Sequence, residues 1–269
     1  MAGKIKILFL AADPFEDRAP LRLAEEARAI TQAIERGAEG SALEIADCWA
    51  ARTGDLQRAL LKHRPQIVHF AGHGSHDDGI HLGDEYGSPR AVGRDALGKL
   101  FAILKPGPAV VVLNACDTAP MAAAFSGVVD YTVAMNAPLP DSWGVLFAEA
   151  FYCALSFGVT VREAFELGVN RLELEGAPGA TIPTLVVREG VDEAQTIAPV
   201  ADARQAVVSL PTSAAPRPGQ RNFIGNLEAG KVAYRSGAGA GAGGQVNRVD
   251  HAKADEVTFE DGVAGPSAA

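Results

Sequence analysis

Short runs of Val, Ile, Leu and Ala alternate with segments of helical periodicity along the first part of the chain. Six runs have the length and the β-branched content of buried strands. They lie at 5–11, 42–49, within 66–75, within 109–118, at 128–135 and at 184–187. Apolar residues three and four apart indicate helices at 20–34, from Thr53 or Asp55 up to Pro65, and at 94–104, 141–157 and 160–174. This alternation predicts an α/β fold, with a mostly parallel six-stranded sheet and helices on both of its faces.

Two of the predicted strands end at residues that can carry chemistry. His73 follows one apolar run, and Cys116 follows another. Parallel strands present their carboxyl ends at one edge of a sheet, so neighbouring strands would bring this imidazole and this thiol together. A lone cysteine at a strand end is more often a core residue than a nucleophile. The two strand ends considered jointly, with Gly72 and Gly74 around the histidine, make the pair the candidate active site.

A thiol beside an imidazole is the arrangement that nucleophilic catalysis uses. His73 can take the thiol proton and later protonate a leaving group. The backbone N–H groups of Gly74 and Cys116 are the predicted oxyanion donors. The residues from Asp117 to Pro120 favour a helix start beside the thiol. The Asp117 carboxylate, in contrast, would oppose a thiolate unless its side chain points away.

The residues around the candidate pair have simpler interpretations. A polar segment at 75–93, with turn residues at 84–89, predicts a small β-hairpin over the site. His69, His73 and His76 have a spacing that can suggest a metal cluster, but the first lies in a strand and the last in a loop. The sequence therefore predicts no metal and no cofactor. Four further residues are interpreted as structural, the histidines through local hydrogen bonds and the cysteines through core packing: His69, His81, Cys48 and Cys153.

Composition narrows the class of partner and the compartment. The formal net charge is −9, and 48% of the 269 residues are hydrophobic. Residues after 198 carry equal numbers of acidic and basic side chains, so the whole excess lies in the first 198 residues. An acidic body disfavours nucleic acid and anionic membranes and can attract basic peptides. Three cysteines and the lack of a long apolar run favour a cytoplasmic protein that neither spans nor binds a membrane.

The composition changes after residue 198. Stretches rich in Pro, Gly, Ala and Ser at 210–219 and 236–244 are too poor in apolar side chains to repay the entropy of ordering, so they predict linkers. Short pieces at 222–227, 231–234 and 256–259 have β character. We therefore expect a domain at 1–198 and a disordered C-terminal tail at 199–269. Plain disorder and a recruitment or inhibitory segment, cut near Arg217, Arg221 or Arg235, both remain open for this tail.

Four ordered segments give the chain a family resemblance. They lie at 6–14, 68–74, 112–118 and 134–141, and the last precedes a helix that carries Phe147, Ala150, Phe151 and Tyr152. Over residues 1 to about 190 the chain resembles a CHAT domain, a prokaryotic branch of the caspase-like (clan CD) cysteine peptidases. The resemblance implies a caspase-like three-layer sandwich and a cysteine endopeptidase with a dyad of His73 and Cys116.

The resemblance also bears on substrates and partners. It implies a peptide or protein substrate and a protein activator or sensor encoded nearby, in a bacterial conflict, stress or cell-death pathway. The alternative is a catalytically silent caspase-fold scaffold. The family resemblance places the substrate pocket at Asn114, Met135 and Asn136. Metacaspases that accept Arg or Lys carry an acid two residues before the cysteine, where this chain has Asn114. Asp84 of the predicted hairpin can supply a carboxylate instead, and we expect a basic residue before the scissile bond.

Overall fold

The computed structural model describes residues 4–104, 106–177 and 179–197, together with strand segments at 221–224, 228–229, 232–238, 245–249, 253–254 and 257–261. The chain divides into two compact units, Met1–Ala201 and Asp202–Ala269. Among the described residues, no helix is both long enough and apolar enough to cross a membrane. All candidate site residues lie in the first unit.

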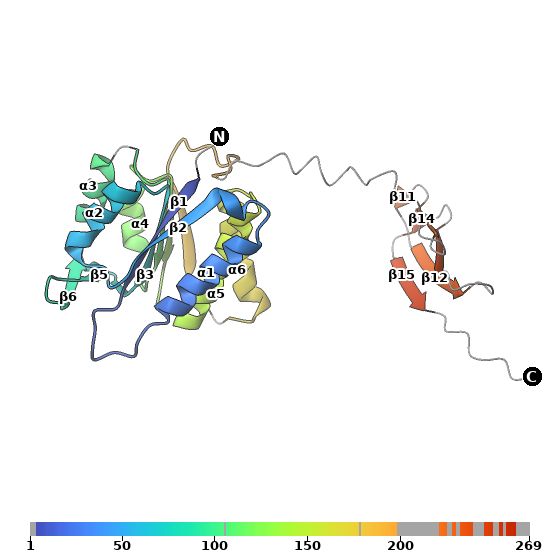
Figure 1. Cartoon of the computed structure of the whole chain (residues 1–269), viewed down its shortest axis with the longest axis horizontal. Helices are drawn as coiled ribbons and strands as arrows, with labels where there is room; N and C mark the ends of the chain where they lie inside the picture. The colour runs from blue at the N-terminus through green and yellow to red at the C-terminus, as the bar shows by residue number, and fades with distance from the viewer. Residues whose placement is uncertain are drawn as a thin grey trace, which may run out of the picture. The chain divides into compact units, whose positions relative to one another are not determined.

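A six-stranded sheet forms the centre of the first unit (Figure 1). In spatial order its strands are β2 (Leu43–Cys48), β1 (Ile5–Ala12), β3 (Ile67–Gly72), β7 (Val110–Asn114), β8 (Tyr131–Met135) and β9 (Pro183–Val187). The first five are parallel, and β9 is antiparallel to β8. The predicted mostly parallel sheet is thus confirmed. β8 begins later than predicted because the N–H groups of Val128 and Val129 form a turn on the carbonyl oxygen of Phe125.

Helices cover both faces of this sheet, as predicted (Figure 1). One face carries α1 (Leu23–Arg36), α5 (Asp141–Ser156) and α6 (Val161–Leu174), and the other carries α2 (Thr53–His63), α3 (Arg94–Ile103) and α4 (Ala119–Phe125). A short 3₁₀ turn, η1 (Gly40–Ala42), precedes β2. The hydroxyl group of Thr160 accepts a hydrogen bond from the N–H of Glu163 and so caps α6 at the predicted residue.

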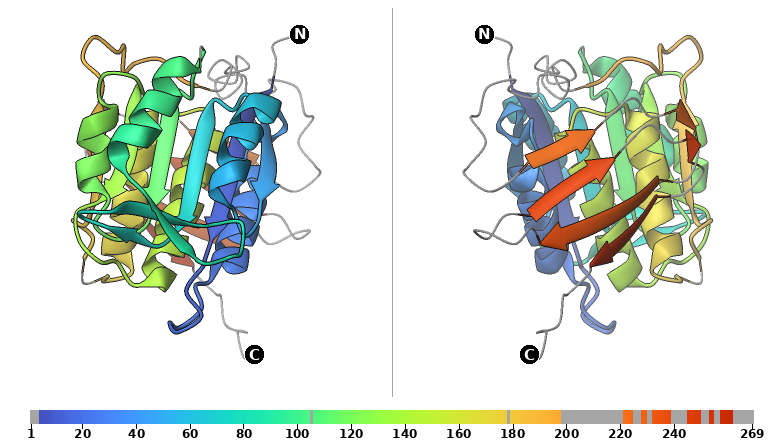
Figure 2. Two further views of the ribbon diagram at one scale, coloured as in Figure 1. Left: turned by 90° about the vertical axis from the view of Figure 1, so that its left-hand side faces the viewer. Right: turned by 90° about the vertical axis from the view of Figure 1, so that its right-hand side faces the viewer.

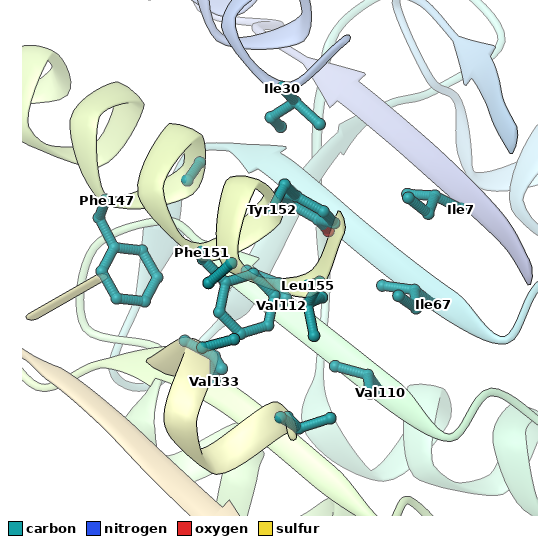
Figure 3. Packing of buried hydrophobic residues seen from close by; sticks show 14 of the residues in the cluster. Ile7, Ile30, Ile67, Val110, Val112, Val133, Phe147, Phe151, Tyr152 and Leu155 are labelled. Carbon is teal, nitrogen blue, oxygen red and sulfur yellow. The ribbon is translucent and has the colours of Figure 1, made fainter. Parts of the chain in front are cut away.

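Alternating side chains of the buried strands fill the two layers between sheet and helices. Phe9 packs toward α1 and α5, whereas its neighbour Leu8 packs toward α2. Figure 3 shows Phe151 and Tyr152 of α5 near Val112 of β7, and all five of these side chains are at most 1% exposed. Burial of each such side chain stabilises the fold by roughly 1.5–3 kcal/mol. The central strands are therefore held rigidly from both sides.

A small antiparallel sheet follows β3. It consists of β4 (Gly74–Ser75), β5 (Gly79–Gly83) and β6 (Pro89–Val92). The predicted hairpin corresponds to β5 and β6, and β4 extends it by one strand. Figure 2 shows this sheet near the end of the main sheet at which the loop between β1 and α1 protrudes. The hairpin therefore lies at the carboxyl edge of the central strands.

All described residues of the second unit belong to short strands. They are β10 (Arg221–Ile224), β11 (Glu228–Ala229), β12 (Val232–Ala238), β13 (Gln245–Val249), β14 (Lys253–Ala254) and β15 (Val257–Asp261). Four pair in the order β10-β13-β12-β15, and β11 pairs with β14. The predicted β-prone pieces overlap β10, β12 and β15. The predicted linker at 236–244 overlaps the end of β12, and the one at 210–219 lies outside the described residues. The boundary after 198 and the disorder of the tail stay predictions.

Candidate active site

The carboxyl ends of β3 and β7 meet at one edge of the sheet. Ala71 of β3 is in register with Asn114 of β7, so His73 and Cys116 each lie two residues beyond the same pair. The loops that follow are in contact, because a Cβ added to Gly74 would lie 2.5 Å from the carbonyl oxygen of Cys116. Both His73 and Cys116 are half-buried. The structure therefore brings the loops that carry the predicted pair into contact, and the pairing of the two side chains and their catalytic role stay predictions.

The loop that carries Cys116 is strained and clamped. The next residue, Asp117, has a φ of 54°, in the left-handed region that few non-glycine residues adopt. Such backbone costs of order 1–3 kcal/mol and persists only where the surroundings enforce it. Thr118 is fully buried, and its hydroxyl group donates to the carbonyl oxygen of Ala115 (3.0 Å) and accepts from the N–H of Met135 (3.1 Å). The same hydroxyl group also lies 3.3 Å from the carbonyl oxygen of Leu113, so Thr118 ties the cysteine loop to both β7 and β8.

His73 is held by a carboxylate that the sequence analysis missed. Asp13 follows β1, the other neighbour of β3, and its Oδ1 lies 3.0 Å from Nε2 of His73. Its Oδ2 accepts a hydrogen bond from the N–H of Leu21 at 3.0 Å. The ring of Phe15 meets the imidazole edge-on at 5.0 Å between centroids. The sequence places Asp13 at a strand end like the other two residues, but only the strand order reveals that this end adjoins β3.

The backbone N–H of Gly74 is left free of the β4–β5 ladder. The N–H of His81 donates to the carbonyl oxygen of His73 at 3.0 Å, which makes these two residues a hydrogen-bonded pair. Hydrogen-bonded and non-bonded pairs alternate in antiparallel strands, so the Gly74–Ile80 pair is a non-bonded one. The N–H of Gly74 therefore points away from β5. An oxyanion donor needs an N–H that is not already bonded within the protein, and among the described residues the N–H of Gly74, the predicted donor, meets this requirement.

Comparison with known proteins identifies the family and the fold of the chain. The family model described as "CHAT domain" matches residues 8–167, more than half of the chain. The chain belongs to the CHAT domain family. Among solved structures it is similar to a secreted C11 cysteine protease from Bacteroides thetaiotaomicron, determined with an irreversible peptide inhibitor. The TM-score is 0.53 at 11% identity, over 69% of this chain and 66% of that one, so slightly less than two thirds of that protein is spanned. No curated protein matches the chain.

In this CHAT domain, Asn114 belongs to a buried polar network on the α1 and α5 face. Oε1 of Glu26 accepts from Nδ2 of Asn114 at 2.6 Å and lies 2.7 Å from Nε2 of His69. Nδ1 of His69 lies 3.1 Å from the hydroxyl group of Tyr152. Burial, and then the charge of Glu26, raise the pKa of Tyr152 well above its ordinary value. The prediction of local hydrogen bonds for His69 is wrong, because its partners come from two distant helices.

The other predicted pocket residues are placed differently from one another. Met135 is 1% exposed and packs in the core, whereas Asn136 is exposed and its N–H donates to the carbonyl oxygen of Ile182 at 2.9 Å. The Oδ1 atom of Asp84 accepts from the N–H groups of Tyr86 and Ser88, so this carboxylate organises the hairpin turn. Of the predicted set, only Asn136 is exposed, whereas the side chain of Asn114 is bonded to the buried Glu26; substrate binding by any of these residues stays a prediction.

His81, Cys48 and Cys153 are the other residues that the sequence predicts to be structural. Nδ1 of His81 is buried without a hydrogen-bond partner among the described residues, so the expected local bond to its ring is not made. Burial lowers the pKa of His81, against a smaller opposing effect of the Asp78 charge. Cys48 and Cys153 are free thiols that are only half-buried. Burial and the charge of Asp55 raise the pKa of Cys48.

Proposed function

We propose that this CHAT domain is a cysteine endopeptidase in which Cys116 is the nucleophile and His73 the acid–base residue. The observation that carries the proposal is the contact between the two loops, in which Gly74 lies against the carbonyl group of Cys116. Family membership and the caspase-like fold support the same reaction class. The strained residue Asp117 fits it too, because backbone strain clusters at active sites.

The reaction proceeds in two halves. His73 takes the proton of the Cys116 thiol as the sulfur attacks the carbonyl carbon of the scissile peptide bond. The tetrahedral intermediate then collapses, the C–N bond breaks, and the imidazolium gives its proton to the leaving amine. Water, deprotonated by His73, hydrolyses the resulting thioester and restores the thiol. Each proton that leaves one group is received by another, so no further reactant is needed.

The N–H groups of Gly74 and Cys116 stabilise the oxyanion of this intermediate. The free N–H of Gly74 supports the assignment, and the fixed loop geometry means that little reorganisation accompanies the reaction. Each such donor contributes on the order of 10²–10³-fold to the rate.

The substrates are peptides or proteins, and a protein partner encoded nearby switches the enzyme on. CHAT domains usually occur together with sensor or scaffold modules in bacterial conflict, stress or cell-death systems. The proposed regulation rests on this association. We place the enzyme in the cytoplasm, where its three free cysteines remain reduced.

Cleavage of casein and of a mixed peptide library tests the proposal. Wild-type protein, Cys116→Ala, His73→Ala and the control Cys153→Ala are compared, alone and with the products of neighbouring genes. Cleavage by the wild type and the control, but by neither site variant, is expected. Full cleavage by Cys116→Ala contradicts the assignment of the nucleophile. If the wild type cleaves nothing in either arm, the scaffold alternative replaces the proposed activity.

A further inference from the structure

Asp13 is bound on both sides of its carboxylate. One oxygen faces Nε2 of His73, and the other accepts from the N–H of Leu21 in the loop between β1 and α1. The side chains of Asp13 and His73 are only 19% and 14% exposed. A hydrogen bond in such a partly shielded site is stronger than the same bond at the open surface. The carboxylate therefore has one fixed orientation, and that orientation addresses His73.

We propose that Asp13 is a positioning residue for His73, so that the site works as a triad of Asp13, His73 and Cys116. The inference rests on the proposed peptidase activity and adds a residue to it. A carboxylate accepts hydrogen bonds but does not donate them when ionised, so the neutral imidazole must carry its proton on Nε2. Nδ1 is then the ring nitrogen left with a lone pair, which the thiol proton of Cys116 requires.

The same loop restrains the imidazole a second time. Phe15, two residues after Asp13, meets the rings of both His73 and His81 at centroid distances of 5.0 and 5.2 Å. The guanidinium carbon of Arg18 lies 3.7 Å from the centre of the Phe15 ring, on the outer, exposed part of the loop. The hydrogen bond from one side and the aromatic contact with Phe15 together leave the imidazole little freedom to rotate. The loop between β1 and α1 thus fixes the position of the His73 side chain.

The variant Asp13→Asn separates positioning from folding. Its amide oxygen can still accept from the N–H of Leu21, but its NH₂ group then faces Nε2 of His73 and favours the proton on Nδ1. That is the wrong tautomer for a base at Cys116. We expect kcat to fall roughly 10²- to 10⁴-fold, as expected when a triad carboxylate becomes an amide, with KM changed less than about threefold. The matched control is Asp17→Asn, which removes an exposed charge from the same loop and should cleave like wild type.

Nitrogen-15 NMR of histidine-labelled protein reads the tautomer directly. The His73 signals are identified by their loss in His73→Ala. In the wild type the neutral ring should carry its proton on Nε2, and in Asp13→Asn the Nδ1–H form should appear. A merely structural role would not change the tautomer. The wild-type spectrum tests the proposal even if Asp13→Asn does not fold, because a His73 with its proton on Nδ1 overturns it.

The failures of the two proposals are distinguishable. If Cys116→Ala and His73→Ala keep their activity, the peptidase assignment fails. If those two lose activity while Asp13→Asn keeps the wild-type kcat and tautomer, the peptidase assignment stands and the positioning role of Asp13 is wrong. If Asp17→Asn loses as much kcat as Asp13→Asn, the effect belongs to loop charge, which also overturns the positioning role.

Discussion

The substitution Gly74→Ala tests whether the histidine and cysteine loops are in contact as described. Gly74 lies in the short strand β4, directly after His73. An added Cβ would meet the carbonyl oxygen of Cys116 at 2.5 Å and Cγ2 of Thr118 at 2.8 Å. Thr118 is buried and hydrogen-bonded to Leu113 of β7 and Met135 of β8, so the cysteine loop cannot easily yield. The loop that carries His73 must therefore move.

The size of that movement sets the expected effect. Ordinary van der Waals contact of a Cβ begins near 3.4 Å, so the two loops must part by close to 1 Å. A misplacement of about 1 Å can cost a reaction on the order of 10²-fold. The overpacking itself costs roughly 1–3 kcal/mol of stability. We therefore expect kcat/KM to fall about 10²-fold or more in a protein that still folds.

Steady-state cleavage and thermal unfolding of the same preparations measure these two effects. The matched control is Gly93→Ala, whose added Cβ would meet no atom within 4 Å, just before α3. It should keep the wild-type rate. A Gly74→Ala enzyme with kcat/KM within about threefold of wild type would refute the inferred contact and, with it, the placement of His73 beside Cys116.

Three further predictions concern stability, specificity and the C-terminal tail. Glu26→Ala leaves the buried donors of His69 and Asn114 without an acceptor, so urea unfolding should show a loss of roughly 3–5 kcal/mol; a loss below about 1 kcal/mol would contradict the network. A positional-scanning library should show a preference for Arg or Lys before the scissile bond, because the domain is acidic and the hairpin segment carries Asp77, Asp78 and Glu85; selection of an acidic residue there would reject this. Truncation after residue 198 should give a folded peptidase that has lost part of its response to an activator, whereas an unchanged response would remove any regulatory role for the tail.

The order of the central elements could be predicted from the sequence because their signals are local. Each buried strand is a short β-branched run, and Thr160 caps α6 within one turn of the chain. His73 and Cys116 became candidates for the same reason, since each follows such a run. The contact between their loops could be expected from the general rule that parallel strands share a carboxyl edge.

Asp13, Glu26 and the Gly74 contact could not be predicted because they depend on strand order and on side-chain packing. Asp13 reaches His73 only because β1 lies beside β3, a pairing that joins residues 60 apart. Glu26 is a charged residue of a helix and would ordinarily be placed in solvent. Its burial becomes favourable only when His69 and Asn114, from two different strands, both supply donors. Contacts between residues so far apart in the chain leave no pattern in a short window of sequence.

The most direct test of the central claim is the rate at which each of the three cysteines reacts with iodoacetamide, followed by mass spectrometry at neutral pH. Cys48 is the internal reference, because its raised pKa keeps most of it in the unreactive thiol form. We predict that Cys116 reacts at least tenfold faster than Cys48 and Cys153 in the wild type, and that His73→Ala removes this advantage without changing the other two rates. Equal rates for all three cysteines, or a fast Cys116 in His73→Ala, would contradict the account.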